Sequence, residues 1–502
     1  MNNIRSRRLM RVATGAALAA AMLPATAKHA ERDGIGILPL PVIASLAGKL
    51  PLANALPEAQ GTSTTVSIPV LGTPLPDLNL RKPPPVSVDP RRSLIVTETA
   101  ILASFPFLDV LNRLAAGSPE SMIARQLYDQ WMDLNNAAPG IGQGGHCDDQ
   151  LSGGLAALNG FAYECPRAEG QLVGTNPSDG GPASFQPVAL VNRFDLATDP
   201  RAGGTDCGEY RLIYAKTSGQ TVTTDRMQII FEGVLPNPSP NGRDLGGCRP
   251  VAQFWADLST VSSVTERASR LRSFFFTGLP GFQPVVQASH YGFSTPNAKG
   301  QVRANQFMQL NWLLREYHLV VVNNRLKMVA APIGSSPAAQ LFDETDVHPK
   351  GADFRNAFLG VVSKLAVNDI NTFNANGLSS QFDPGDGDQQ HATRSNATAL
   401  FPRSPNFAAS IQKKLDAARS AITPAQTVER AMAMSCAGCH QLSNGKALGG
   451  GLVWPSSLQF THVSEAQRET GPEGQRFRVS PALTDVFLPR RKAVLETFVN
   501  SR

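Results

Sequence analysis

The strongest constraint on this 502-residue chain is a five-residue segment near its C-terminus, Cys436-Ala437-Gly438-Cys439-His440. Two thiols separated by two residues and followed directly by an imidazole are what covalent haem attachment requires. The sulfurs add to two vinyl groups of the porphyrin, and the histidine reaches the iron from one face. On a helical backbone this spacing places all three side chains on one side. The segment predicts one covalent haem c, attached through Cys436 and Cys439 and ligated by His440.

Three other roles for the cysteine pair need to be weighed. A thiol-redox dyad favours a strand that leads into the motif and a helix that the motif opens. A zinc site needs two further ligands nearby, and only His440 and His462 follow the pair. A histidine would follow a given pair by chance in only about 2% of cases. A purely structural pair, in an extracytoplasmic binding or scaffold protein, stays open as an alternative.

The N-terminal residues 1–27 have the pattern of a secretory signal peptide. Four arginines precede an apolar run over residues 12–23, and small residues at 25–27 offer a cleavage site. The Arg7-Arg8 pair also suggests a twin-arginine signal, which exports folded proteins, whereas haem attachment needs accessible thiols. An ordinary basic leader is therefore favoured, and the expected location is periplasmic or secreted.

The net charge of +6 belongs mainly to this leader. Without its four arginines the chain keeps 42 basic and 40 acidic side chains, so the charge indicates no nucleic-acid partner. The apolar run of the leader is too short to span a bilayer, and no later segment qualifies, so no membrane span is expected in the mature protein.

Residues 28–90 contain 11 of the 38 prolines, no cysteine and no aromatic residue. Prolines at this density interrupt regular elements, and a segment without aromatic residues cannot anchor a core. The segment is expected to be a proline-rich linker or a belt on the next domain.

Residues 91–405 are expected to form an α+β domain. Helical spacing of apolar residues and runs of β-branched residues occur in blocks, which is not the strict alternation of a doubly wound sheet. Asn323 and Asn324 separate two of the expected strands and tolerate the positive φ of a tight hairpin turn. The expected helices are 100–114, 122–134, 252–258, 265–276 and 353–365, and the expected strands are 188–194, 210–214, 227–231, 319–322 and 325–330.

Four cysteines lie in this domain, at positions 147, 165, 207 and 248. In an oxidising compartment they are expected to form two disulfides, for which the sequence allows three connectivities. Pairing of neighbours closes the shortest loops and predicts Cys147–Cys165 and Cys207–Cys248.

Two further patterns lack the context that their chemistry needs. Residues 140–145 match the glycine spacing of a dinucleotide-binding loop but follow a helix instead of a strand. Asp383, Asp386 and Asp388 lack the glycine and the closing glutamate of a calcium loop. We expect these aspartates in a solvated turn within a polar boundary over residues 367–405.

The C-terminal residues 406–502 resemble a c-type cytochrome domain. Thr423-Pro424-Ala425-Gln426 is a helix start with a capping box, and the helix over 428–434 leads into the haem motif. A second helix, over 490–499, ends the chain with an apolar stripe. The resemblance implies a small all-α, cytochrome c-like domain after the α+β domain.

The sequence departs from small electron-transfer cytochromes at the second axial ligand, because no methionine follows His440. His462 is the one histidine downstream and is therefore the candidate distal ligand. His290, His318 or His348 from the main domain, and an open sixth position, remain alternatives. Trp454 and Phe460, which lie downstream of the motif, are candidates to pack on the porphyrin or, equally, are ordinary core aromatics.

The expected function is that of an exported c-type cytochrome that transfers electrons to or from a redox partner protein or a small molecule. The alternative within haem chemistry is an oxidoreductase with an open iron site. No pair of carboxylates and no nucleophile with a base stands out in residues 91–405, so the sequence assigns no catalytic residue.

Overall fold

The computed structural model describes residues 85–142, 144–239, 244–292, 299–309, 312–388 and 395–501. Residues Arg81–Arg502 cluster as one compact unit. The expected signal peptide and nearly all of the proline-rich segment lie outside the described residues. Within the described part of the chain, no helix is long and apolar enough to cross a bilayer.

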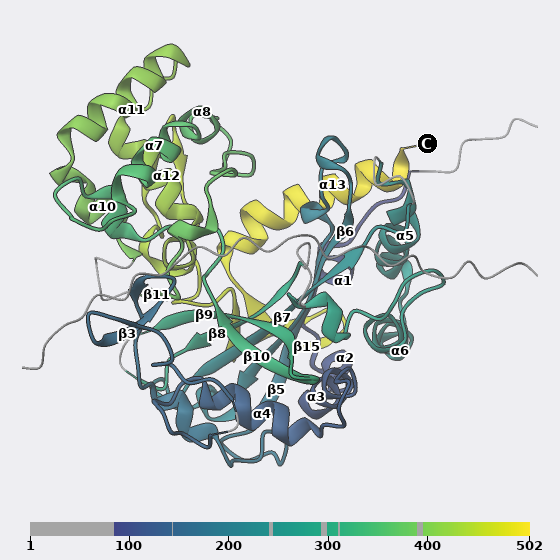
Figure 1. Ribbon diagram of the computed structural model, residues 1–502. Coiled ribbons are helices and arrows are strands. Elements are labelled where there is room, and N and C mark those ends of the chain that lie inside the picture. Colours follow the sequence, from purple (N-terminus) through teal and green to yellow (C-terminus); the bar gives the residue numbers. More distant parts are fainter. Residues whose placement is uncertain are drawn as a thin grey trace, which may run out of the picture. The chain divides into compact units, whose positions relative to one another are not determined.

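An antiparallel sheet of eight strands, here called the main sheet, forms the centre of the fold (Figure 1). Its order is β1-β5-β6-β7-β8-β9-β10, and β11 pairs with β9 beside β10. The strands are β1 (Ile95–Val96), β5 (Phe185–Arg193), β6 (Asp206–Lys216), β7 (Met227–Pro236), β8 (Gln301–Gln306), β9 (Leu313–Val322), β10 (Arg325–Ala331) and β11 (Asp386–Asp388). Three small antiparallel sheets comprise β2 (Leu151–Ser152), β3 (Leu155–Leu158) and β4 (Phe161–Ala162); β12 (Ala447–Gly449) and β13 (Leu452–Val453); and β14 (Val463–Gly471) and β15 (Gly474–Val479).

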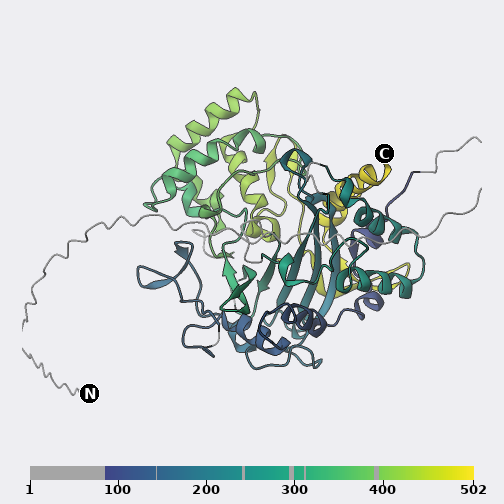
Figure 2. The same cartoon turned by 45° about the vertical axis from the view of Figure 1, so that its right-hand side comes forward.

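The helices of the first half of the fold are α1 (Pro90–Ser93), α2 (Thr99–Leu102), α3 (Phe107–Ala115), α4 (Ala124–Asp133), α5 (Arg249–Asp257) and α6 (Val264–Phe276). Those of the second half are α7 (Gly351–Leu359), α8 (Val362–Leu365), α10 (Ala397–Leu400), α11 (Pro405–Ala417), α12 (Pro424–Met434) and α13 (Leu488–Asn500). Helices α7 to α12 gather into one group, and α13 runs from this group towards α5 (Figures 1 and 2).

The hairpin of β9 and β10 confirms the turn predicted at Asn323 and Asn324. Both residues have positive φ, 51° and 63°, which is the backbone that a two-residue turn of this hand needs. Asparagine adopts this conformation at low cost, so the local sequence determines the register of the hairpin.

The two faces of the main sheet differ because side chains alternate along each strand. On one face, aromatic residues of the strands pack on Phe107 of α3 and Trp131 of α4. Phe107 contacts Tyr214 and Phe231 at ring separations of 5.0 and 6.1 Å, and Trp131 contacts Phe231 at 6.0 Å. The opposite face carries charged side chains among aliphatic ones, and the C-terminal residues lie on it.

The expectation of a separate, small all-α domain at the C-terminus is wrong. Residues 406–501 contain the β14–β15 hairpin as well as helices, and Val463, Phe477 and Leu495 belong to the same core as the main sheet. Arg476 of β15 and Glu98, which directly precedes α2, form an isolated antiparallel β-bridge. The fold is therefore a large antiparallel sheet with helices, to which the C-terminal residues contribute directly. The flanking helices were visible in the sequence, but the tertiary packing of the hairpin between them was not.

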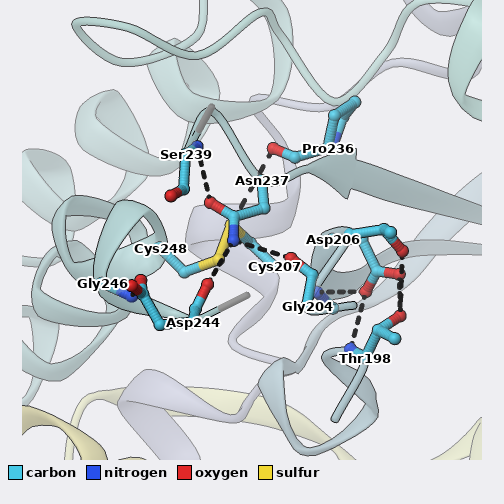
Figure 3. Close-up of a disulfide and its surroundings, with 12 residues drawn as sticks. Thr198, Gly204, Asp206, Cys207, Pro236, Asn237, Ser239, Asp244, Gly246 and Cys248 are labelled. Atoms are coloured by element: carbon cyan, nitrogen blue, oxygen red, sulfur yellow. Dashed lines mark hydrogen bonds between the residues drawn. A yellow bond between two sulfur atoms is a disulfide. The ribbon is translucent and has the colours of Figure 1, made fainter. Parts of the chain in front are cut away.

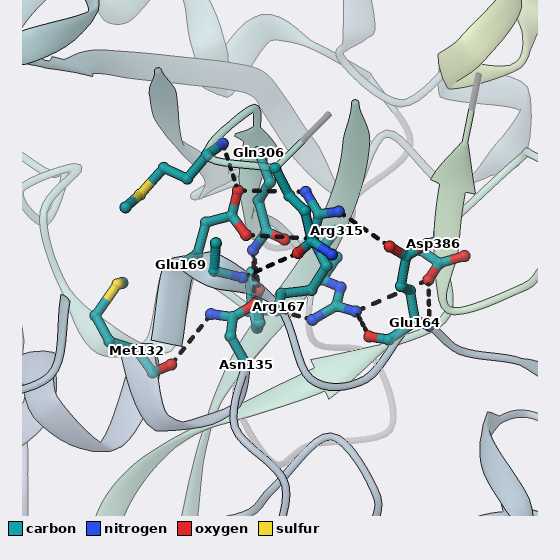
Figure 4. A network of polar contacts seen from close by, with 12 residues as sticks. Met132, Asn135, Glu164, Arg167, Glu169, Gln306, Arg315 and Asp386 are labelled. Atoms are coloured by element: carbon teal, nitrogen blue, oxygen red, sulfur yellow. Dashed lines mark hydrogen bonds and ion pairs between the residues drawn. The ribbon is translucent and has the colours of Figure 1, made fainter. Parts of the chain in front are cut away.

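The solvated turn expected around Asp386 is also not what the structure has. Asp383, Asp386 and Asp388 are all buried, and β11 extends the main sheet. Asp386 accepts a hydrogen bond of 2.9 Å from the backbone N–H of Glu164 and lies 3.8 Å from the guanidinium of Arg315. This buried network continues to Asn135 beyond α4 (Figure 4). Polar composition indicated a loop here, because pairing with a charged partner on a distant strand leaves no local pattern.

Both disulfides predicted by neighbour pairing are present, Cys147–Cys165 and Cys207–Cys248. They close loops with sequence separations of 18 and 41 residues, which corresponds to a loss of unfolded-state entropy worth about 3 and about 4 kcal/mol. Beside the second disulfide, the Asn237 amide donates to the carbonyls of Gly204 and Asp244, each at 2.7 Å (Figure 3). Two disulfides indicate folding in an oxidising compartment.

Candidate functional site

The predicted haem motif faces a cavity of about 290 Å³ between the main sheet and the C-terminal residues. Both cysteines and both histidines of the prediction, Cys436, Cys439, His440 and His462, line this one cavity. Its apolar walls are Ile95, Val191, Ile213, Ile230, Leu314, Met434, Val463, Leu483 and Phe487. Residues from the main sheet and from the C-terminus therefore enclose it together.

Helix α12 delivers the motif to the cavity. The predicted capping box is present, since Thr423 Oγ1 accepts from the N–H of Gln426 and the Gln426 side chain accepts from the N–H of Thr423. After α12 ends, Ser435 Oγ accepts from the N–H of Gly438 at 3.1 Å. A wide helical turn over Gly438–Leu442 then carries Cys439 and His440.

Gly438 is required by the close approach of this turn to α12. A Cβ atom at this position would lie 1.8 Å from the carbonyl oxygen of Met432, a backbone atom that cannot yield by a side-chain rotation. Of the two residues between the cysteines, the second must therefore be glycine for packing reasons.

Changing Gly438 to alanine is expected to destabilise the protein. The clash with the Met432 carbonyl must displace the turn, at a cost of about 1–3 kcal/mol, measured as a lower urea midpoint at unchanged slope. Gly445, where a Cβ atom would meet no neighbour within 4 Å, provides the control. Because Gly445 has φ +69°, the matched substitution there is Gly445→Asn, which tolerates this backbone. Equal midpoints for Gly438→Ala and wild type would contradict the steric argument.

The two thiols are neutral groups in this environment. Burial raises the pKa of Cys436 to about 12 and that of Cys439 to about 11. A reactive cysteine needs the opposite shift, because the thiolate is the nucleophile. The raised pKa values argue against a thiol-redox dyad. They argue equally against a nucleophilic pair formed by Cys439 and His462, although Cys439 Sγ lies only 3.4 Å from His462 Nε2.

The backbone around residue 460 holds the His440 ring in one orientation. His440 Nδ1 donates to the carbonyl oxygen of Phe460 at 2.6 Å, and the N–H of Phe460 donates to the carbonyl oxygen of His440 at 3.1 Å. Gln459 and Phe460 both have positive φ, 52° and 73°, a strained backbone that is typical of functional sites. With Nδ1 bonded to a carbonyl, Nε2 is the nitrogen that can bind a metal.

The His462 ring is fixed in the same manner. Its Nδ1 forms a hydrogen bond of 2.9 Å with Ser480 Oγ, so Nε2 is again the nitrogen directed to the cavity side, towards Cys439. Burial lowers the pKa of His440 to about 4 and holds the pKa of His462 well below its usual value. Both rings are therefore neutral at pH 7, which is the form that binds metals.

The two imidazoles that line the cavity lie next to each other. Their ring centroids are 5.0 Å apart, with planes at 63°. Imidazole nitrogens bind first-row metals at about 2 Å, which puts the centroids of two opposed rings roughly 6 Å apart. The observed rings are closer than that and lie edge to face, so they would have to move apart to hold one iron between them.

The other candidate histidines do not line the cavity. His290 Nδ1 contacts the carbonyl oxygen of Val285, His318 contacts Glu316, and His348 stacks on Phe161. Trp454 packs in a different cluster, against Phe373 and Phe487. Among the described residues, no three His, Cys, Asp or Glu side chains converge on a metal-ion site, so the four ligands of structural zinc are not gathered here.

Phe460 and Trp312, a residue that sequence reasoning missed, form an aromatic stack beside His440. Trp312 stacks on His440 at 5.7 Å and on Phe460 at 5.2 Å. Trp312 is buried, and it directly precedes β9 in the chain. No local signal links it to a residue 128 positions downstream.

Sequence reasoning also missed the charged lining of the cavity, which consists of Arg193, Arg211, Arg303, Arg491 and Glu232. Four of these lie on β5, β6, β7 and β8, on the face of the main sheet opposite the aromatic core. A charged residue at alternate positions of several β-prone segments was the available signal. Such charged residues indicate a sheet face that is neither exposed to solvent nor part of an ordinary apolar core.

No protein-family model, no curated protein and no solved structure matches the chain.

Proposed function

We propose that the chain is an exported c-type cytochrome that holds one covalent haem in this cavity and transfers electrons. The observation that carries the proposal is the donor set. Two thiols with the attachment spacing and two imidazoles, each with its Nδ1 occupied, border a single cavity. This is the set of groups that covalent attachment and two axial bonds require.

The residues that line the cavity suit a porphyrin in chemical character. The apolar residues of the lining can pack on the faces of the ring, and the arginines of the lining supply cations for an anionic ligand. The cavity volume of about 290 Å³ lies at the lower end of the range of cofactor sites. Cofactor sites are usually clefts of about 300–1,000 Å³ with mainly apolar walls and a few polar groups.

In this proposal each side chain has a separate task. Cys436 and Cys439 would hold the haem through thioether bonds, and His440 Nε2 and His462 Nε2 would bind its iron. The Phe460 carbonyl and the Ser480 hydroxyl orient the two rings through their Nδ1 atoms, and the carbonyl, which can only accept, fixes the tautomer of His440. When bound, the haem supplies one-electron chemistry between ferric and ferrous iron. Trp312, which stacks on the His440 ring, would help to hold that ring in place.

Two histidine ligands favour electron transfer over an open, ligand-activating iron. Bis-histidine coordination leaves no free position, and it lowers the reduction potential relative to His/Met coordination. The same proposal implies a redox partner and a physiological electron donor. They are a protein or small molecule that exchanges single electrons outside the cytoplasm.

The decisive experiment is maturation of the full chain in a host with and without a haem-attachment system. We expect a denaturation-resistant haem signal and a mass increase of one haem only with that system. The pyridine haemochrome spectrum should show two thioether bonds. Protein without haem from the competent host would instead support an extracytoplasmic binding or scaffold role with a structural cysteine pair.

A further inference from the structure

A second cavity, here called the polar cavity, has a volume of about 370 Å³ and shares no lining residue with the cavity of the motif. It lies between residues 219–226, which connect β6 to β7, and residues 457–467 of the C-terminal part. Within the second range, Gln459 and Thr461 line the polar cavity, whereas His462 lines the cavity of the motif. One segment of chain therefore contributes to the walls of both cavities.

The lining of the polar cavity is rich in uncharged polar side chains and carries a net positive charge. Three glutamines contribute amide groups, and the charged side chains are those of Arg226, Arg478 and Glu465. Hydroxyl groups come from Thr221, Thr223, Ser457, Thr461 and Ser464. Amides and hydroxyls both donate and accept hydrogen bonds, as the hydroxyl groups of a ligand do. A lining of this composition is complementary to a small molecule with several hydroxyl groups and one negative charge.

The one carboxylate among these lining residues is already bound by protein groups. Glu465 is buried; it pairs with Nε of Arg226 and accepts a hydrogen bond of 3.0 Å from the side-chain amide of Gln228. Arg478 is exposed, and its Nη1 donates to Oε1 of Gln467 at 3.1 Å. A guanidinium has five N–H groups, so each arginine keeps donors for a ligand after these contacts. The negative charge of Glu465 is thus compensated, and the charge of Arg478 is available to an anion.

A row of aromatic rings connects the polar cavity to the His440 ring. Trp312 stacks on His440 and on Phe460, with ring centroids 5.7 and 5.2 Å apart. The rings of Phe460 and Phe307 follow at 6.1 Å, and the guanidinium carbon of Arg226 lies 4.2 Å from the centre of the Phe307 ring. A molecule held by Arg226 is therefore joined to the candidate iron ligand through packed side chains, and packed atoms transmit electrons better than an empty gap does.

We propose that the polar cavity binds a small organic anion with several hydroxyl groups, and that this anion is the electron donor of the cytochrome. The donor role rests on the proposed function, whereas the binding site depends only on the residues of the lining. In the exchange the bound anion loses one electron and the proton of one hydroxyl group. Ferric iron takes up the electron and becomes ferrous, the proton passes to solvent, and the oxidised anion leaves as a radical.

Binding is tested by isothermal titration calorimetry of the exported full chain with gluconate, an anion that carries five hydroxyl groups. We expect wild type to bind gluconate more tightly than sorbitol, which has the hydroxyl groups without the charge. Arg478→Gln should bind gluconate about tenfold more weakly, because one charge-assisted hydrogen bond is lost. Arg468→Gln removes the same charge from an exposed residue of the same hairpin outside the lining, and it should bind as wild type does.

A second pair of variants adds a negative charge in place of removing a positive one. Gln467→Glu puts a carboxylate beside Arg478 in the lining, so it should also weaken gluconate binding about tenfold. Gln475→Glu makes the same change at an exposed residue of the hairpin outside the lining and serves as its control. Absence of gluconate binding by wild type, or equal binding by both variants and their controls, would overturn the site.

The donor role is tested by stopped-flow reduction of the haem-loaded protein with ascorbate, a hydroxylated anion that gives up single electrons. We expect the rate to saturate with ascorbate concentration and to fall when gluconate competes. Reduction that gluconate leaves unchanged, in a protein that binds gluconate, would overturn the donor role. Wild-type protein without covalent haem would overturn the proposed function and the donor role together, whereas gluconate binding by that protein would still support the site.

Discussion

Replacing Cys436 and Cys439 together by alanine is expected to abolish covalent haem while the protein still reaches the oxidising compartment. Each sulfur supplies one thioether bond, so each single variant should keep haem through one bond only. The pyridine haemochrome band of a single variant should shift towards that of haem with a free vinyl group. Haem staining after denaturing electrophoresis and intact mass measure the covalent fraction.

The matched control removes two sulfurs elsewhere. Cys147 and Cys165 form a disulfide away from the cavity, so the double alanine variant at these positions should retain full covalent haem despite a stability loss of about 3 kcal/mol. Covalent haem in the Cys436/Cys439 variant would contradict the assignment of the motif.

Replacing His462 by alanine is expected to convert the iron from six ligands to five. Ser480 holds the ring at Nδ1, which leaves Nε2 to bind the iron in the proposed arrangement, so loss of the ring would open the distal position. Reduced wild type should leave carbon monoxide unbound, and reduced His462→Ala should bind it rapidly with a change in the visible spectrum. His462→Met should restore a sixth ligand and raise the reduction potential, since His/Met coordination stabilises ferrous iron.

His348 provides the control for this experiment, because it stacks on Phe161 outside the cavity. His348→Ala should behave as wild type towards carbon monoxide. Ready carbon monoxide binding by wild type would show an open distal position and favour the oxidoreductase alternative over the electron carrier.

Local sequence signals predicted the features that depend on a few adjacent residues. Asn323 and Asn324 specify a hairpin because their own backbone adopts positive φ at little cost. Thr423 and Gln426 specify a helix start because the two side chains bond each other's backbone. The Cys436–His440 motif is equally local, and its haem chemistry stays a prediction. Neighbour pairing of cysteines succeeded for the same reason, because short loops close most readily.

The features that sequence reasoning missed depend on contacts between distant segments. Arg193 and Arg491 share Asp195 across almost 300 residues of chain. Asp386 appeared to belong to a polar loop because its partner, Arg315, lies on another strand. The β14–β15 hairpin joins the core of the main sheet through Val463 and Phe477, and this packing cannot be inferred from a helix on either side.

The position of the motif between the main sheet and α13 determines the order in which such a protein can mature. Without haem, this cavity of about 290 Å³ leaves its apolar lining in contact with solvent, so the haem-free chain is less stable than the haem-loaded one. The haem-free chain should therefore remain open and sensitive to protease, with Cys436 and Cys439 accessible to the attachment machinery. Closure of the last helix over the sheet then becomes the step that cofactor attachment permits, and export of an unfolded chain is the route that fits it.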